Sequence, residues 1–229
     1  MSLPTTSAEL ARFIDHTLVR ADATIQDLEK LCDEAREHKF YSVSLNGSWV
    51  AAAHHFLEDS DVKVGCAVGF PLGAMSSDAK RFETEAAIDE GAEEIDVVLN
   101  LGRLKGGDDK YVLRELRDVA EAADERIVKV ILETCLLTQD EKVRACNLVV
   151  DSGAHFVKTS TGLSTGSATV EDVKLLRELV GPKFGVKASG GIRDTKTALA
   201  MIAAGATRLG ASASVAIVQG FDVPSLGSS

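Results

Sequence analysis

The chain has 229 residues, 45% of them hydrophobic and 26% charged, with a net charge of −10 and an isoelectric point near 5.0. This size and composition predict one large domain, residues 1–229, because α/β barrels often reach this length undivided. The acidic balance excludes a basic nucleic-acid surface and disfavours an anionic membrane as partner, so an anionic ligand would need a local site.

Along the chain, short β-branched runs alternate with amphipathic helical patterns. Eight strands alternating with helices predict an α/β fold, a single (β/α)8 TIM barrel with a short N-terminal helix. An open doubly wound sheet would fit the same alternation, but it usually carries a G-x-G-x-x-G turn after its first strand, and this chain has none. In chain order, the expected strands are Phe13–His16, Tyr41–Leu45, Val62–Val68, Glu94–Leu99, Ile127–Glu133, His155–Thr159, Phe184–Ala188 and Thr207–Gly210.

Local signals mark the ends of the helices between these strands. Thr138 and Glu141 have the spacing of a capping box, and Thr24 with Asp27 is a looser version of it. Three helices are expected to stop at a Gly-Ala pair just before a strand, which is typical of the return half of a βαβ unit. These pairs are Gly91-Ala92, Gly153-Ala154 and Gly205-Ala206.

The two ends of the chain and its cysteines indicate a cytoplasmic protein. The first residues lack a basic region followed by an apolar run, and no stretch approaches ~18 apolar residues, so neither a signal peptide nor a membrane span is expected. The four cysteines have neither metal-ligand spacing nor the density of a disulfide scaffold. Residues 220–229 lack periodicity, and we expect them to be a mobile tail.

A V-K-x-S-x-G pattern occurs in two of the late strands, around Lys158 and Lys187. The two lysines are 29 residues apart (187 minus 158), about one βα unit, so they should lie side by side on strands ~4.8 Å apart. Lys129, one such interval earlier, is further from the end of its strand and should lie deeper. The alternative is that these lysines face the helices and extend to solvent, or are neutralised by acids such as Asp96. The repeated motif favours the inward orientation.

Two close lysines in a barrel mouth suggest Schiff-base chemistry. A free lysine has a pKa of ~10.4 and is only about 0.04% neutral at pH 7, yet the neutral amine is the form that attacks a carbonyl. A neighbouring cation and desolvation lower that pKa. The neutral amine condenses with an aldehyde or ketone to form an iminium. The iminium withdraws electrons from a neighbouring carbon–carbon bond, as in class I aldolases. Spacing alone does not choose between Lys158 and Lys187.

Acids and small residues complete the expected site. Alternation places Asp96 on one face of its strand with Val98 and Asn100, opposite Ile95, Val97 and Leu99. Asp96 is therefore a structural anchor or an acid–base group, and Asp15 resembles it in a shorter strand. Glycines and hydroxyls end three late strands, which favours phosphate binding by backbone N–H groups, although tight turns would explain them too. These are Ser160-Thr161-Gly162, Ser189-Gly190-Gly191 and Gly210-Ala211-Ser212.

Neither arginine near these loops is expected to bind the ligand, because Arg193 is expected at a helix start and Arg208 in a strand. Adjacent His54 and His55 cannot share a helix face, so no catalytic metal is expected.

Five segments resemble the bacterial deoxyribose-phosphate aldolase family, in its order and over nearly the whole chain. They are Asp15–Leu18, Val68–Gly73, Glu94–Asn100, Phe156–Gly162 and Val186–Ile192. The resemblance implies that Lys158 forms the Schiff base, while Lys187 and Asp96 relay protons. The site for the substrate and its phosphate would comprise Thr161, Gly162, Gly190, Gly191, Ser212 and Asp15.

The implied reaction is the reversible cleavage of 2-deoxyribose 5-phosphate to glyceraldehyde 3-phosphate and acetaldehyde, without metal or organic cofactor. The expected partners are sugar-phosphate and aldehyde substrates, with a homo-oligomer left open. Ser44 and Gly47 depart from the family pattern, where Cys and Pro are common. Neither departure removes a catalytic group, but both residues are expected at a strand end near the mouth, so the resemblance fixes the chemistry more firmly than the substrate preference. The alternatives are another lysine-dependent sugar-phosphate aldolase, a transaldolase-like enzyme, or a barrel that binds sugar phosphates without catalysis.

Overall fold

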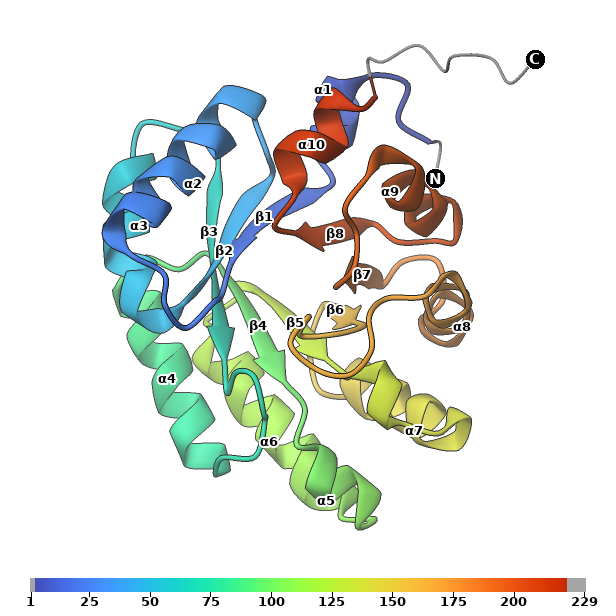
Figure 1. Cartoon of the computed structure of the whole chain (residues 1–229). Coiled ribbons are helices and arrows are strands. Elements are labelled where there is room, and N and C mark those ends of the chain that lie inside the picture. The colour runs from blue at the N-terminus through green and yellow to red at the C-terminus, as the bar shows by residue number, and fades with distance from the viewer. Residues whose placement is uncertain (1–2, 222–229) are drawn as a thin grey trace, which may run out of the picture.

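The computed structural model describes residues 3–221, and they form a closed barrel of eight parallel strands that follow one another in chain order. The last strand pairs with the first, and helices surround the strands (Figure 1). The (β/α)8 TIM barrel predicted from the alternating patterns is therefore confirmed. Within residues 3–221, we find no helix with the length and apolarity needed to cross a membrane.

Every predicted strand forms, and its ends lie within two residues of the expected ones. The pattern succeeds because most strands contain β-branched residues and each lies between a helix end and a polar loop. The strands are β1 (Ile14–Leu18), β2 (Ser42–Asn46), β3 (Lys63–Val68), β4 (Glu94–Val98), β5 (Ile127–Ile131), β6 (Phe156–Lys158), β7 (Gly185–Ser189) and β8 (Arg208–Ala211).

The helices include the expected short N-terminal one and a short extra helix, α5, after β4. They are α1 (Ser7–Ala11), α2 (Ile25–His38), α3 (Val50–Leu57), α4 (Ser77–Asp89), α5 (Leu101–Lys105), α6 (Asp109–Ala122), α7 (Gln139–Val150), α8 (Val170–Val180), α9 (Thr195–Ala203) and α10 (Ser214–Gln219). Two 3-10 turns, η1 (Gly47–Trp49) and η2 (Thr134–Leu136), follow β2 and β5. Gly220 and Phe221 follow α10, and the rest of the expected tail lies outside the described residues.

The helix ends are formed by the residues that predicted them. Thr24 and Thr138 each make a complete capping box, at the starts of α2 and α7. Gly91, Gly153 and Gly205 follow α4, α7 and α9 with φ of 104°, 90° and 114°. This left-handed region favours glycine, which lets the chain leave each helix and enter the next strand directly.

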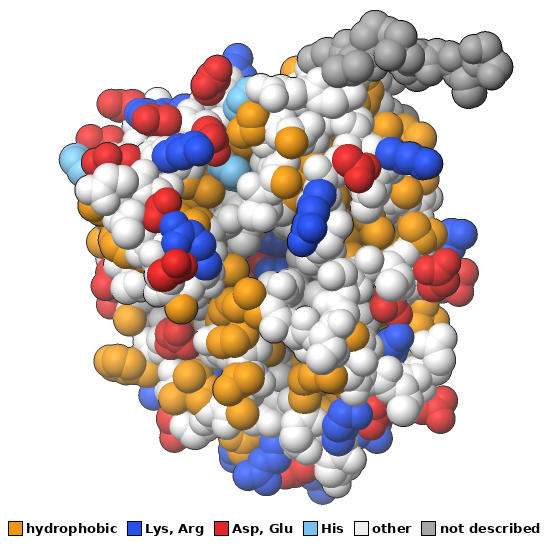
Figure 2. All heavy atoms as spheres, viewed as in Figure 1, with side chains coloured by type: hydrophobic (Ala, Val, Ile, Leu, Met, Phe, Trp, Pro, Cys, Tyr) orange, Lys and Arg blue, Asp and Glu red, His pale blue; other side chains and the backbone are white. Residues whose placement is uncertain are grey.

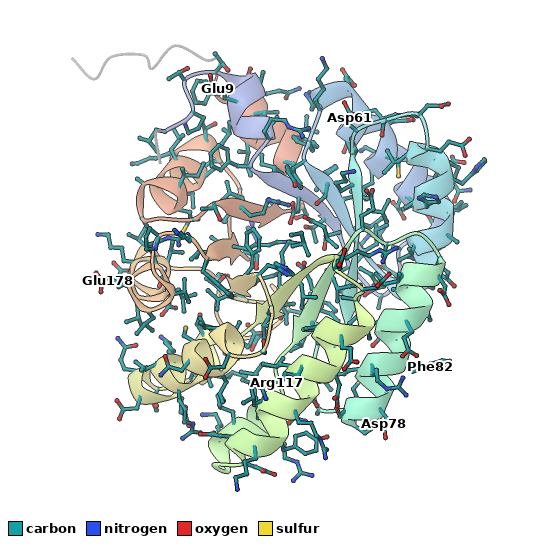
Figure 3. The ribbon with its side chains drawn as sticks, turned by 180° about the vertical axis from the view of Figure 1, so that it is seen from behind. Glu9, Asp61, Asp78, Phe82, Arg117 and Glu178 are labelled. Atoms are coloured by element: carbon teal, nitrogen blue, oxygen red, sulfur yellow. The ribbon has the colours of Figure 1, made fainter. Side chains whose placement is uncertain are left out.

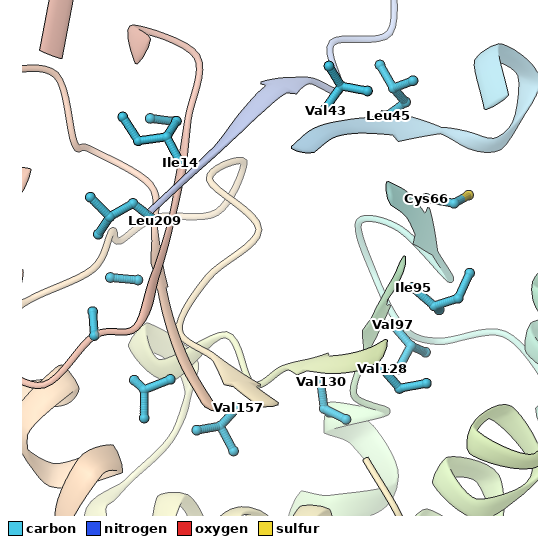
Figure 4. Packing of buried hydrophobic residues seen from close by; sticks show 14 of the residues in the cluster. Ile14, Val43, Leu45, Cys66, Ile95, Val97, Val128, Val130, Val157 and Leu209 are labelled. Carbon is cyan, nitrogen blue, oxygen red and sulfur yellow. The ribbon is translucent and has the colours of Figure 1, made fainter. Parts of the chain in front are cut away.

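The strands divide their side chains between two layers. Alternate residues such as Ile95 and Val97 of β4, with Val128 and Val130 of β5, point outward and form the apolar core beneath the helices (Figure 4). The intervening residues point into the barrel, because side chains alternate across a strand. In this chain they include Asp96 and many other charged groups, so the interior of the barrel is polar.

A buried ion pair joins two of the outer helices. Figure 3 shows α4 and α6 side by side at the back of the molecule. Between them, Lys80 Nζ donates to Glu115 Oε1 at 2.6 Å and to the Val98 carbonyl at 2.8 Å, and both side chains of the pair are 0% exposed. Burial lowers the pKa of Lys80 and raises that of Glu115. The pair therefore anchors the end of β4 at a cost in desolvation.

Candidate active site

A cavity of about 440 Å³ opens at the carboxyl ends of the strands. Figure 2 shows a hollow near the centre of this face, with basic side-chain atoms at its bottom. The wall is formed by the ends of β1, β6, β7 and β8, the loops that follow them, and one face of α2. Its residues include Lys158, Thr161, Gly162, Gly190, Gly191 and Ser212, so six of the nine expected site residues line one cavity.

Lys158 is the lysine that reaches this cavity. It is the last residue of β6, its side chain is 6% exposed, and its Nζ donates to Asp96 Oδ2 at 2.7 Å. It pairs in register with Lys187 of β7, as the repeated motif predicted. Burial lowers the pKa of Lys158 to about 8, Lys187 acts in the same direction, and Asp96 opposes both. At neutral pH a usable fraction of the amine is therefore uncharged.

Lys187 lies behind Lys158, away from the cavity wall. Its Nζ donates to the same oxygen, Asp96 Oδ2, at 2.7 Å, and it also contacts Asp15 Oδ2. A neighbouring residue must be small here, because a Cβ on Gly210 would lie 3.1 Å from Lys187 Cε. Lys187 is thus confined beside Asp96, within reach of Lys158 through one shared carboxylate oxygen.

Asp15 was expected to bind substrate, and the structure places it elsewhere. Its side chain is 1% exposed and is absent from the cavity wall. The carboxylate contacts Lys187 and accepts from Arg208 Nη1 at 2.8 Å, and these cations hold the pKa of Asp15 far below its usual range in spite of burial. Asp15 therefore supports Lys187 from beneath.

A deeper layer of charges closes the interior. Lys129 Nζ donates to Glu94 Oε2 and Asp96 Oδ1, each at 2.8 Å, and lies deep in the barrel, as expected. Burial alone would lower the pKa of Lys129, but Asp96 and Glu94 outweigh it and raise the pKa. Arg208 donates to Glu94 Oε2 at 3.1 Å and stacks 3.4 Å from the centre of the Tyr41 ring.

Asp96 is the hub of this cluster. Burial on its own would raise its pKa, but Lys129, Lys158 and Lys187 overcome this effect and hold the pKa well below the usual value. Among the seven side chains that these ion pairs connect, four are cations and three are carboxylates. The most weakly compensated cation is Lys158, whose ammonium contacts one carboxylate oxygen, whereas Lys129 and Lys187 each contact two carboxylates.

The other end of the cavity has the features of an anion site. Gly162, Gly190 and Gly191 have φ of 85°, 86° and 74°, a region in which only glycine is unstrained. Within residues 3–221, the backbone N–H groups of Gly162 and Gly191 donate to no protein acceptor. Thr161 is held by Glu133, whose carboxylate accepts from both its backbone N–H and its hydroxyl.

The sequence missed several charged side chains on this wall. Arg20, Asp27, Lys30 and Glu34 of the β1–α2 region all line the cavity. Arg193, which was expected only to start a helix, also lines it, while its neighbour Asp194 makes the N-cap of α9. No local motif marks these residues, because charges on a surface helix look alike until the helix packs beside a cavity.

Ser44 and Gly47 do not form part of this wall, contrary to expectation. Ser44 is buried within β2, in register with Thr17 and Gly65. Gly47 starts η1, where an added Cβ would only meet Cys66 Sγ at 3.9 Å.

Residues 10–221 match the family model of DeoC/LacD family aldolases. The chain is 62% identical to a protein from Alkaliphilus oremlandii named deoxyribose-phosphate aldolase, over 210 residues that cover 91% of this chain and 95% of the relative. A Geobacillus relative of the same name is 56% identical over 212 residues, covering 92% and 95% of the two chains. The tetrameric deoxyribose phosphate aldolase of Aeropyrum pernix has a TM-score of 0.89 at 33% identity, covering 94% of this chain and 92% of that one.

Proposed function

We propose a specific reaction for this chain, which belongs to the DeoC/LacD family of aldolases. The reaction is the reversible cleavage of 2-deoxyribose 5-phosphate to glyceraldehyde 3-phosphate and acetaldehyde, with Lys158 as the Schiff-base nucleophile. The observation that carries it is a lysine of lowered pKa at a cavity wall, backed by a carboxylate and a second lysine.

Lys158 is favoured over the other interior lysines for two reasons. It is the only one of the three that lines the cavity in the described residues 3–221. It is also the most weakly paired, so losing its proton breaks the fewest ion-pair contacts. A pKa of about 8 leaves roughly one-tenth of the amine neutral at pH 7, against about 0.04% for an ordinary lysine.

The reaction then follows from the chemistry of the amine. Lys158 adds to the C1 aldehyde of the open-chain sugar and loses water to give an iminium. Loss of the proton from the C3 hydroxyl turns C3 into the aldehyde carbon of glyceraldehyde 3-phosphate, which leaves as the C2–C3 bond breaks. The electron pair of that bond flows into the iminium to give a neutral enamine. Protonation at C2 and hydrolysis release acetaldehyde and regenerate the amine.

Asp96 and Lys187 would serve the proton transfers. Both lie behind Lys158. Asp96 Oδ2 accepts hydrogen bonds from Lys158 and from Lys187, so a proton can pass among the three groups without a large movement. Neither lines the cavity, so their contact with the substrate would run through Lys158 or through a water molecule. Asp15 would keep Lys187 in place from below.

The substrate phosphate would bind at Thr161, Gly162, Gly190, Gly191 and Ser212. The unpaired N–H groups of Gly162 and Gly191 can donate to an anion, and Arg193 adds a positive charge on the same wall. A local site of this kind accommodates a phosphate on a chain of net charge −10.

The same proposal extends to the cofactors, location and assembly of the protein. The proton transfers and the lysine adduct account for the reaction without a metal or organic cofactor, and residues 1–229 would act as one aldolase domain in the cytoplasm. By analogy with the tetrameric Aeropyrum pernix protein, this chain would assemble as a homo-oligomer.

Borohydride reduction in the presence of acetaldehyde, followed by peptide mass mapping, tests the proposal. The expected product is N-ethyl-lysine at position 158. An adduct only at Lys187 would reverse the two roles while keeping the chemistry. An enzyme that cleaves the sugar phosphate and yet forms no adduct would exclude the Schiff base.

A further inference from the structure

His16 lies where the first and last strands of the barrel meet. It belongs to β1 and pairs in register with Ala211 of β8. Figure 1 shows these two strands next to each other. The residue is 3% exposed, and its ring packs at 5.1 Å, centre to centre, against Phe40. Its two ring nitrogens reach two different helices, at 2.9 Å from Glu34 Oε2 of α2 and 2.9 Å from Ser214 Oγ of α10.

The hydrogen bonds around the ring fix its protons. The Glu34 carboxylate only accepts, so Nε2 must carry a hydrogen. Burial lowers the pKa of His16, which leaves the ring neutral at neutral pH and makes Nδ1 an acceptor for the Ser214 hydroxyl. The same hydroxyl also lies 2.9 Å from the Ala211 carbonyl. Because it has a single hydrogen, it donates either to the imidazole or to the end of β8, and Ser214 lies within hydrogen-bond distance of both.

These contacts lead directly to the anion end of the cavity. Ser214 is fully buried and opens α10, whose N-cap residue, Ala213, offers no side-chain cap. Ser212, a proposed phosphate contact, lies between Ala211 and Ser214 in a short loop. The Ser214 hydroxyl lies within hydrogen-bond distance of Ala211, at the other end of this loop, and of His16, which connects Ser214 to α2.

We infer that His16 is a positioning residue, which ties the loop carrying Ser212 to Glu34 of α2 and thereby sets the affinity of the cavity for the phosphate of the substrate. The inference rests on the proposed function, because it assigns this loop to phosphate binding. The helix α2 belongs to the first βα unit and the loop with Ser212 to the last, so no short stretch of chain joins them. The buried hydrogen bonds of His16 connect them instead.

The charges facing His16 agree with a positioning role rather than direct binding of the anion. Glu34 is the nearest charge, and Lys30, one turn earlier in α2, lies 3.8 Å from Glu34. His38 is the other titratable group that acts on the ring, from the end of α2. His16 itself lies on the cavity wall. Its Nε2 is bound to the Glu34 carboxylate, which would repel a phosphate at that nitrogen, so the proposed effect runs through Ser214.

The test compares two sugars, 2-deoxyribose 5-phosphate and 2-deoxyribose, in His16→Phe and Ser214→Ala. We expect each variant to raise KM for the phosphorylated sugar about tenfold, the order expected for one lost hydrogen bond, with kcat nearly unchanged. KM for 2-deoxyribose should stay within about twofold. The inhibition constant of inorganic phosphate should rise together with KM, and His16→Gln, which can still donate to Glu34, should recover part of the loss.

His38→Phe is the matched control, because this ring also stacks on Phe40, at 5.5 Å, but does not line the cavity. It should leave both KM values unchanged. Equal losses for the two sugars, or no loss in Ser214→Ala, would overturn the inference. A wild-type protein that cleaves neither sugar would instead refute the proposed function, and calorimetric binding of inorganic phosphate to the same variants would still test the role of His16.

Discussion

Replacing Lys187 by Met should raise the pKa of Lys158, because it removes a cation that faces the same carboxylate oxygen. Each Nζ lies 2.7 Å from Asp96 Oδ2, so the two nitrogens are within about twice that distance of each other. At roughly 5 Å and an effective dielectric constant of about 20, the repulsion is about 3 kcal/mol, which corresponds to a pKa change of about two. The pKa of Lys158 should therefore move from about 8 towards about 10.

The consequence is a loss of neutral amine at pH 7, from roughly one-tenth to roughly one-thousandth of the molecules. The assay is the rate at which acetaldehyde forms an adduct trapped by cyanoborohydride, measured against pH. We expect the midpoint to shift upward in Lys187→Met and to stay near the wild-type value in Lys187→Arg, which keeps the charge. An unchanged midpoint in Lys187→Met would refute the electrostatic coupling and leave Lys187 a role in proton transfer alone.

Three further changes test other parts of the site and the fold. Asp96→Asn removes the group that opposes deprotonation, so the trapping midpoint of Lys158 should fall, while turnover should still drop at least ~10²-fold if Asp96 relays protons. A folded variant with near-normal turnover would make Asp96 a structural residue. Gly191→Val places a Cβ 2.9 Å from that of Ser167 at a φ of 74° and should raise KM for the phosphorylated sugar about ten- to over a hundredfold, the effect of losing roughly 1.5–3 kcal/mol. Comparable losses with 2-deoxyribose would indicate a distorted barrel instead. Lys80→Met leaves Glu115 buried without its ion-pair partner and should reduce the free energy of unfolding in urea by about 3–5 kcal/mol, whereas adding Glu115→Leu should restore most of it. A double variant as unstable as the single one would contradict a desolvation cost in this pair.

The sequence predicted the barrel and the pairing of the two lysines because both depend on local patterns. Strands were recognised from β-branched runs and from the glycines that end the preceding helices. Lys158 and Lys187 were placed side by side because one βα unit separates them, and parallel strands keep that register. The glycine-rich loops were found for the same reason.

Long-range packing explains what the sequence did not predict. Asp15 was assigned to the substrate because its short strand gave no clue that Arg208 and Lys187 would enclose it. Arg20 and Lys30 lie on a charged helix and its preceding loop, and only the docking of α2 brings them to the cavity. His16 precedes Thr17 in a recognised motif, but its polar contacts are 18 and 198 residues away along the chain.

The balance of charge in the barrel connects the resting site to the reaction. With every group ionised, the connected cluster has one more cation than carboxylates, so release of a proton from Lys158 brings it to neutrality. In the proposed reaction, formation of the iminium would return a positive charge to that nitrogen, and a buried site solvates the excess poorly. Flow of the C2–C3 electron pair into the iminium removes the charge again. If Lys158 forms the iminium, the electrostatic imbalance that lowers the pKa of its amine also favours the bond cleavage, because both steps discharge the same nitrogen.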